Sequence, residues 1–186
     1  NATAGQIYST VLDRERKGEY LGDTVQVIPH VTDEIIRRIK RINTPKKYDV
    51  VICEVGGTVG DIESLPFMEA IRQLSLEVNH ENHMLVHVTL LPFVKASGEL
   101  KSKPTQHSVM KLREIGLAPD MILCRSEYPI EQPVRDKIAL FCNVRPDHVI
   151  EGRDVPSIYE VPLAMYEQNA GQLIKDRLNI KKTPHL

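Results

Sequence analysis

Residues 48–63 have the sequence YDVVICEVGGTVGDIE, in which a continuous run of mostly β-branched residues leads into three glycines. Such a run is typical of a strand covered on both faces in a parallel sheet. We therefore predict a strand from Tyr48 to Val55 that ends in a glycine-rich turn. In sheets of this kind ligands bind beyond the carboxyl ends of the strands, so the turn is a candidate site.

Further along the chain, predicted strands alternate with predicted helices. Strands are expected at residues 84–93, 121–124 and 148–150, and helices are expected at 6–17, 32–42, 64–78, 110–115, 134–141 and 157–178. The second helix carries the usual signals of a start, because Thr32 stands at the cap position and Asp33 and Glu34 lie in the first turn. The alternation predicts an α/β fold, a three-layer parallel sheet with helices on both faces, in what is most simply one domain.

Composition argues against several classes of protein. The formal net charge of the 186 residues is -1, so the overall field does not attract nucleic acid or an anionic membrane, and neither is expected as a partner. The sequence contains no apolar run of about 18 residues and no signal-peptide core, which predicts a cytoplasmic protein. Cys53, Cys124 and Cys142 are expected to be reduced thiols in the core.

The turn after the predicted first strand carries three carboxylates. Glu54 stands at the end of the strand, and Asp61 and Glu63 follow the glycines. Glycines let a ligand approach the backbone, and a carboxylate beside them is suited to hold Mg²⁺ on a nucleotide phosphate. The alternative is that Glu54 is an edge charge and Asp61 caps the following helix. The residue pattern alone leaves both interpretations open.

A second candidate site is the segment KASGELKSKPTQHS at residues 95–108. Here Lys101 and Lys103 precede a predicted helix, so their ammonium groups and the free N–H groups of the helix start could together bind an anion. The alternative is a basic loop that faces water. Lys137 belongs, by its pattern alone, to the polar face of an amphipathic helix.

Four segments taken together resemble the CTP synthase family. They are YLGDTVQVIPH at 20–30, EVGGTVGDIESLPF at 54–67, KSKPTQ at 101–106 and KIALFCNV at 137–144. The resemblance extends from about Gly5 to Leu178 and is closer to bacterial members than to animal ones. It implies a P-loop NTPase-like amidoligase fold, similar to dethiobiotin synthetase.

The resemblance implies an activity and a set of ligands. In this family ATP phosphorylates O4 of UTP, and ammonia from a class I glutaminase domain then displaces the phosphate to give CTP, which is also the feedback inhibitor. The implied Mg²⁺ ligand is Glu54, and the implied CTP-recognition segment is Asp61, Ile62 and Glu63. The implied UTP-binding residues are Lys101, Ser102, Lys103, Pro104, Thr105, Gln106 and Lys137. Lys101 and Lys103 are expected to bind phosphate and to be catalytic.

The resemblance also implies an assembly. Gln26 matches a residue that reaches a nucleotide bound mainly by a neighbouring subunit, so a homotetramer is expected. Arg125, Asp154 and Val155 resemble positions near the adenine of ATP.

Parts of the family pattern are not found in residues 1–186. These are the glycine-rich phosphate loop with its lysine, a second acidic Mg²⁺ ligand and the glutaminase domain. We therefore expect the chain to be a partial amidoligase domain that neither phosphorylates UTP nor cleaves glutamine by itself. One alternative is a nucleotide-binding and tetramerisation module of the same family without chemistry. Another is a different P-loop relative, such as a dethiobiotin synthetase or a partitioning ATPase, which would leave the segment 101–106 unexplained.

Overall fold

The computed structural model describes residues 1–45 and 48–181. The chain forms two compact units, Asn1–Glu77 and Val78–Leu186, and each is described by itself. No helix in the described part of the chain is both long and apolar enough to cross a membrane.

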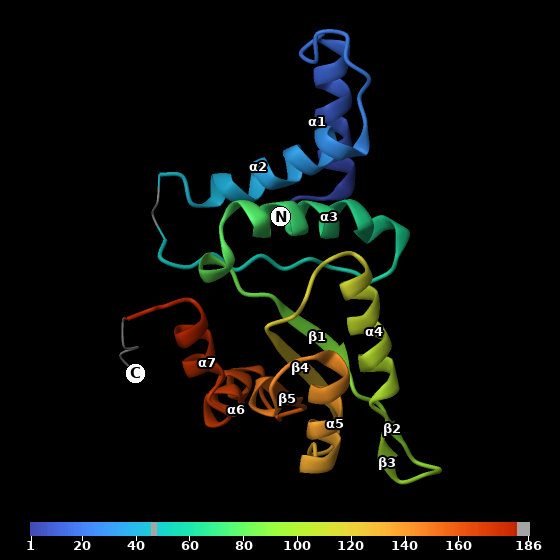
Figure 1. Cartoon of the computed structure of the whole chain (residues 1–186), viewed down its shortest axis with the longest axis vertical. Helices are drawn as coiled ribbons and strands as arrows, with labels where there is room; N and C mark the ends of the chain where they lie inside the picture. Colours follow the sequence, from blue (N-terminus) through green and yellow to red (C-terminus); the bar gives the residue numbers. More distant parts are fainter. Residues whose placement is uncertain (46–47, 182–186) are drawn as a thin grey trace. The chain divides into compact units, whose positions relative to one another are not determined.

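The first unit is built from three helices: α1 (Ala4–Arg16), α2 (Thr32–Ile42) and α3 (Leu65–Glu77) (Figure 1). Helix α1 begins with a capping box, in which Thr3 and Gln6 each accept a hydrogen bond from the other's backbone N–H. Its apolar stripe packs on α2 and α3 through a cluster of buried residues, which are Ile7, Val11, Val31, Ile35, Ile36 and Ala70. The three helices confirm the predicted ranges to within a few residues.

The predicted strand from Tyr48 to Val55 is wrong. No strand occurs at these residues or elsewhere among the described residues of the first unit. Most of the side chains face solvent, with Ile52 90 % exposed and only Val51 and Val55 partly buried, so the segment is not covered on both faces. Cys53, expected in the core, is exposed for the same reason. β-branched residues favour an extended backbone, but a strand also needs a neighbour that pairs with its N–H and C=O groups.

The second unit contains the parallel sheet. Its strands are β1 (Val86–Leu90), β4 (Met121–Ser126) and β5 (Val149–Arg153), in the order β1-β4-β5. Val86 pairs with Met121 and Ile122 with Val149, and both pairings are parallel. A short antiparallel hairpin, β2 (Phe93–Val94) with β3 (Glu99–Leu100), follows β1.

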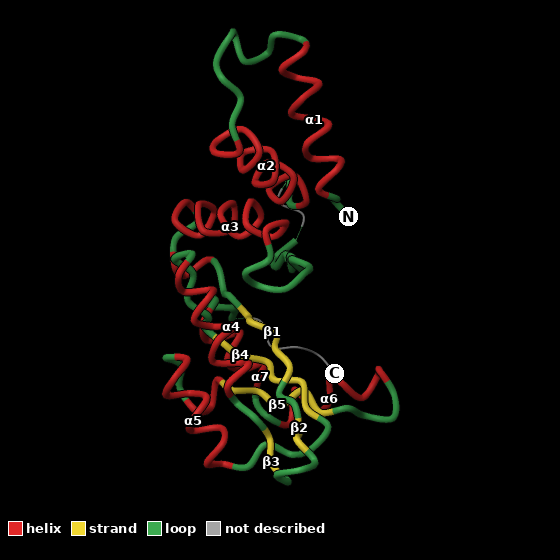
Figure 2. Tube along the Cα trace, turned by 90° about the vertical axis from the view of Figure 1, so that its right-hand side faces the viewer, coloured by secondary structure: helices red, strands yellow, loops and turns green. Residues whose placement is uncertain are grey.

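Helices cover both faces of this sheet, which confirms the predicted α/β architecture (Figures 1 and 2). On the central strand β4, Ile122 and Cys124 point to one face, where helices α4 (Lys103–Glu114) and α5 (Gln132–Cys142) pack. Met121 and Leu123 point to the other face, where α6 (Val161–Glu167) and α7 (Ala170–Arg177) pack. Alternate residues of one strand thus supply two cores, as expected for a strand in a three-layer fold.

Two predicted helices differ from those in the structure. The helix predicted around residues 110–115 begins earlier, at Lys103. The single helix predicted at 157–178 is divided into α6 and α7, because Asn169 adopts the left-handed conformation with φ of 59°. Asparagine tolerates that conformation better than most residues do, so it can end one helix and start the next.

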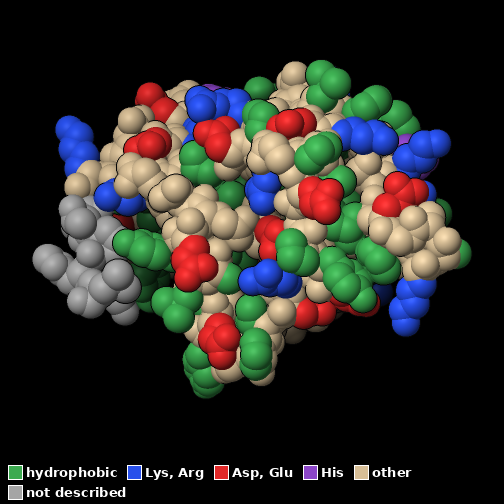
Figure 3. Space-filling view, turned by 90° about the horizontal axis from the view of Figure 1, so that it is seen from below, with side chains coloured by type: hydrophobic (Ala, Val, Ile, Leu, Met, Phe, Trp, Pro, Cys, Tyr) green, Lys and Arg blue, Asp and Glu red, His purple; other side chains and the backbone are tan. Residues whose placement is uncertain are grey.

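Charged side chains are mixed on the surface. On the face shown in Figure 3, Lys and Arg side chains are interspersed with Asp and Glu side chains. This mixture agrees with the formal net charge of -1.

Candidate functional site

The glycine-rich turn of the first unit lines a cavity. The cavity has a volume of about 190 Å³ and is lined by Ala4, Gly56, Gly57, Asp61, Glu63, Ser64 and Phe67. Two glycines in the turn, Gly57 and Gly60, have φ of 92° and 103°, values that side-chain-bearing residues rarely adopt. Glu54 Oε1 lies 3.6 Å from the position that a Cβ at Gly56 would occupy, so this carboxylate lies over the turn.

Asp61 shapes the same turn. Its Oδ2 accepts a hydrogen bond from the Thr58 N–H at 3.3 Å, and its backbone carbonyl accepts one from the Ser64 hydroxyl at 2.8 Å. Asp61 makes no side-chain cap bond to the helical turn Ile62–Ser64. Ile62 is 81 % exposed, and the Glu63 carboxylate is exposed beside it. The carboxylates of Asp61 and Glu63 therefore line the cavity together with glycine backbone, whereas Ile62, which lies between them in the sequence, faces solvent and is not part of the lining.

Gln26 belongs to the first unit as well. It is exposed, and its backbone N–H donates to His30 Nδ1 at 3.0 Å across the turn Val27–Val31. This bond fixes the backbone and leaves the Gln26 side chain at the surface.

In the second unit, the predicted site residues gather at the carboxyl edge of the parallel sheet. Strands β1, β4 and β5 run parallel, so the segments that leave them lie at one edge. The segment 101–106 follows the hairpin after β1, Arg125 lies near the end of β4, and Asp154 follows β5. Arg125 NH2 approaches Asp154 Oδ1 at 3.3 Å. Both side chains of this pair are more than half exposed, and Val155 is half-buried beside them.

Lys101 and Lys137 both lie near the Glu99 carboxylate. Lys101 Nζ donates a hydrogen bond to Glu99 Oε1. That hydrogen bond lowers the pKa of Glu99 below its usual range, and the charge of Lys137 contributes in the same direction. Lys101, a predicted phosphate-binding residue, thus contacts the Glu99 carboxylate, and Lys137, a predicted UTP-binding residue, lies near enough to act on the same carboxylate through its charge.

The other residues of segment 101–106 form the start of α4. Lys103 and Pro104 are exposed in the first turn, and the buried Ser102 hydroxyl accepts a hydrogen bond from Gln106 Nε2 at 3.0 Å. Thr105 is fully buried. The segment therefore divides into residues that face solvent and residues that hold the helix in place.

Sequence reasoning did not identify Glu99 or Thr89 as parts of this region. Glu99 is a single acidic residue in a basic segment, and its role depends on how the hairpin folds. Thr89 and His87 are two positions apart in β1, so the sequence indicates that both polar side chains lie on the same face of the strand. A sequence pattern cannot say which helix such a row contacts.

Comparison with known proteins identifies related sequences over nearly the whole chain. A family described as "CTP synthase N-terminus" matches residues 1–180. The chain is 60 % identical over 180 residues to a CTP synthase of Caldanaerobacter subterraneus subsp. tengcongensis, covering 97 % of this chain and 34 % of that protein. It is 53 % identical over 184 residues to a CTP synthase of Bacillus cytotoxicus, covering 99 % of this chain and 34 % of that protein.

A third relative matches the whole chain. The chain is 55 % identical over 187 residues to a CTP synthase of Methanococcus maripaludis, covering 100 % of this chain and 35 % of that protein. The chain thus spans about a third of the length of the curated relatives it matches.

Proposed function

The chain belongs to the CTP synthase family, to whose N-terminal part it corresponds, and from this premise we propose that it is the nucleotide-binding part of an enzyme that aminates UTP at the expense of ATP. The observation that carries this proposal is the arrangement of Lys101 and Lys137 about the Glu99 carboxylate. Two ammonium groups that already attract one anionic oxygen are suited to attract those of a triphosphate.

The proposed UTP site uses the carboxyl edge of the sheet in the second unit. Lys101, Lys103 and Lys137 neutralise phosphate oxygens, and Gln106 and Ser102 complete the segment. Lys101 and Lys103 also stabilise charge that develops on the transferred phosphoryl group, because fixed cations cost no reorganisation during the reaction. In this proposal ATP phosphorylates O4 of UTP, and ammonia displaces that phosphate.

Arg125, Asp154 and Val155 are proposed to bind the adenine of ATP. Their position at the same edge of the sheet supports this assignment. An exposed ion pair next to a half-buried valine offers hydrogen-bonding groups and an apolar surface together, as an adenine ring requires.

In the first unit, the cavity at the glycine-rich turn is proposed to recognise CTP through Asp61, Ile62 and Glu63. Carboxylates accept hydrogen bonds from hydroxyl and amino groups, whereas they repel phosphate, so the cavity suits the nucleoside part. Gln26 is proposed to serve a neighbouring subunit of a homotetramer, and its exposed side chain supports this role.

Glu54 fits a role as a Mg²⁺ ligand. Its carboxylate lies over glycine backbone that leaves room for a ligand. Among the described residues no group of three or more His, Cys, Asp and Glu side chains converges, so one or two carboxylates would share the ion with nucleotide phosphates, as is usual for Mg²⁺. When bound, the ion neutralises charge on the phosphates.

Isothermal titration tests the proposed UTP site. We expect the chain to bind UTP with Mg²⁺, and the substitution Lys101→Met to weaken binding about tenfold because a charge-assisted phosphate contact is lost. Lys111→Met is the matched control, since Lys111, like Lys101, pairs with a glutamate, but it lies near the end of α4 and contacts Glu114 at 2.7 Å. Equal losses in the two variants, or no UTP binding by the unsubstituted chain, would contradict the proposal.

A second proposal concerns turnover by the chain alone. We infer that it binds nucleotides without converting them, because residues 1–186 contain no glycine-rich phosphate loop with its lysine. Ammonia, if used, comes from a glutaminase domain. CTP formation from ammonia, UTP and ATP by this polypeptide is the measurement that would refute the inference.

A further inference from the structure

Helix α4 is attached to β1 by a row of side-chain hydrogen bonds. Thr89 Oγ1 lies 3.2 Å from Thr105 Oγ1, and Thr105 Oγ1 lies 3.4 Å from the Leu90 carbonyl oxygen. One helical turn further along, His87 Nε2 lies 2.8 Å from Ser108 Oγ. The row is regular because alternate residues of the strand meet helix residues three positions apart.

The Thr105 hydroxyl makes its hydrogen bonds to other atoms of the protein. Thr105 has no exposed surface. Its single proton goes to the Leu90 carbonyl, so the Thr89 hydroxyl is the donor to Thr105 Oγ1. A hydroxyl in this position does not reach a ligand in solution, whereas Lys103, two residues earlier, is exposed.

The start of α4 has no side-chain cap. Ser102 stands at the N-cap, but its side chain makes no cap bond to the backbone and instead accepts from Gln106 Nε2. A helix without a side-chain cap loses about 1 kcal/mol of stabilisation at its first turn. The contact of Thr105 with β1 therefore lies where the helix start is otherwise least constrained.

We propose that Thr89 is a positioning residue for the phosphate-binding segment, and that Thr105 acts through Thr89 and the Leu90 carbonyl and does not contact the nucleotide. The pair fixes the first turn of α4 against the carboxyl end of β1. It thereby sets the direction in which Lys103 projects and fixes the end of the segment that begins at Lys101, whose own N–H donates to the Pro92 carbonyl at 2.9 Å. This inference rests on the proposed UTP site, because it explains how that segment is held.

Binding measurements distinguish positioning from direct contact. The variants are Thr89→Val and Thr105→Val, which keep the side-chain shape, and the double variant. If Thr105 is held by Thr89 and the Leu90 carbonyl, Thr89→Val weakens binding of UTP with Mg²⁺ about fivefold, Thr105→Val weakens it at least as much, and the double variant is no weaker than Thr105→Val. Thr89→Ser retains the hydroxyl and restores binding. If Thr105 contacts UTP directly, only Thr105→Val loses affinity, and that result overturns the proposal.

Ser108→Ala is the matched control, because it removes the other bond of the row one turn away from the lysines. It is expected to change UTP affinity by less than about twofold while costing similar stability. If Ser108→Ala and Thr89→Val lose equal affinity, Thr89 contributes only to the stability of the fold, and the proposal is overturned.

Hydrogen exchange at the Gln106 amide tests the anchor without any nucleotide. This amide donates to the Ser102 carbonyl at 3.0 Å and reports the first helical bond of α4. We expect its exchange to be about tenfold faster in Thr89→Val and little changed in Ser108→Ala. Absence of UTP binding by the unsubstituted chain would refute the proposed function alone. Unchanged exchange in Thr89→Val would refute the anchor alone.

Discussion

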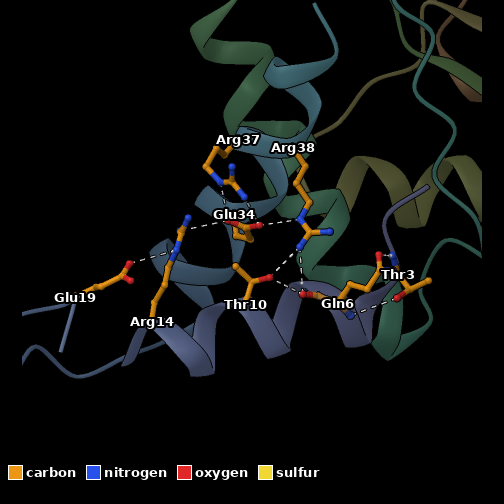
Figure 4. A network of polar contacts seen from close by, with 8 residues as sticks. All are labelled: Thr3, Gln6, Thr10, Arg14, Glu19, Glu34, Arg37 and Arg38. Carbon is orange, nitrogen blue, oxygen red and sulfur yellow. Dashed lines mark hydrogen bonds and ion pairs between the residues drawn. The ribbon is translucent and has the colours of Figure 1, made fainter. Parts of the chain in front are cut away.

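Glu34 is the most heavily bonded carboxylate in the first unit. Its side chain is fully buried, and it accepts from Arg37 at 2.7 and 2.8 Å and from Arg38 at 2.7 Å, while Arg14 lies 3.3 Å away (Figure 4). Arg38 also donates to the Thr10 hydroxyl at 2.9 Å. Because Arg14 and Thr10 belong to α1 and Glu34 to α2, this network joins the two helices.

Replacing Glu34 by Gln should destabilise the first unit by about 2–3 kcal/mol, since three guanidinium groups lose their common counter-ion while the glutamine amide stays buried. Urea unfolding monitored by a probe in this unit measures the change. Asp13→Asn is the control, because the Asp13–Arg16 pair is exposed and 3.8 Å long, and it should change stability by less than about 0.5 kcal/mol. Similar effects of both variants would show that the network contributes little.

The same network predicts a pH dependence. The hydrogen bond from Arg37, with those of Arg38 and the charges of Arg37 and Arg14, lowers the pKa of Glu34 from 4.5 to about 2 against the effect of burial. A pKa that is lower in the folded state gives stabilisation that is complete above the unfolded value of 4.5 and is lost as the pH falls toward about 2. The stability difference between the unsubstituted chain and Glu34→Gln should therefore shrink between about pH 6 and pH 3. A constant difference over that range would contradict the assignment.

Glu99 competes with phosphate for Lys101 if the proposed UTP site is correct. Removing its charge with Glu99→Gln should free the ammonium group and lower the Kd for UTP about threefold, a small effect because the pair is exposed. Glu114→Gln is the control, since it removes the partner of Lys111 on the same helix. Weaker binding by Glu99→Gln in isothermal titration would mean that Glu99 orients Lys101 and does not compete for it.

Single residues differ in how far the sequence predicted them. The lysines of segment 101–106 are predicted as an anion site from their charge, their small neighbours and the helix that follows, and all three are local features. Arg37 and Arg38 are neighbours of Glu34 on α2, whereas Arg14 lies on α1, and Thr105, the partner of Thr89, lies 16 positions along the chain. Distant partners such as Arg14 and Thr105 are set by packing and leave no local pattern.

Among the secondary-structure elements, α6 and β5 are joined by one side chain. Gln168 Oε1 accepts from the Glu151 N–H, and Gln168 Nε2 donates to the Glu151 carbonyl, each at 2.8 Å. Gln168 Nε2 also donates to the Ala164 carbonyl at 3.0 Å. The amide thus pairs with the free edge of β5 as a backbone peptide of another strand would.

Gln168→Ala should destabilise the second unit by about 2 kcal/mol, because it leaves two backbone groups of β5 without partners. Hydrogen exchange of the Glu151 amide, together with urea unfolding, measures the effect. Gln172→Ala is the control on α7, where the side chain bonds only the exposed Asp176. If the Glu151 amide exchanges no faster in Gln168→Ala than in Gln172→Ala, the amide does not protect the edge.

Most elements of the fold could be predicted, and the failures have a common cause. Helices α1, α2, α3 and α5 follow from apolar spacing, which is a local signal. The prediction that Thr32 caps α2 is wrong, because Val31 stands at the N-cap and the Thr32 hydroxyl donates to the Pro29 carbonyl instead of accepting from the helix. The segment 48–55 has the intrinsic preference of a strand, but pairing depends on residues elsewhere. The break between α6 and α7 lies at the left-handed Asn169, next to Gln168, whose side chain bonds β5, and no helical pattern reveals either feature.

At the level of the whole molecule, each unit has its own hydrophobic clusters. The cluster around Ile7 and Ile35 consists of residues before Glu77. The clusters on the two faces of the sheet, around Ile122 and around Ile150, consist of residues after Val78. A unit needs a hydrophobic core of its own in order to fold alone, and each of the two units has one.

The segment Val78–Leu186 should therefore fold when it is produced alone. Both faces of its sheet remain covered, and Arg177 Nε still donates to Asp120 Oδ1 at 2.7 Å, which holds α7 beside the strands. We expect cooperative thermal unfolding and slow exchange of the β4 amides, because β4 is the central strand. A shorter segment, residues 78–168, is the control: it keeps α6 but lacks Ala170, Leu173 and Ile174 of α7, so one face of the sheet loses part of its cover and cooperativity should fall. Non-cooperative unfolding of the longer segment would mean that the sheet requires the first unit for its stability.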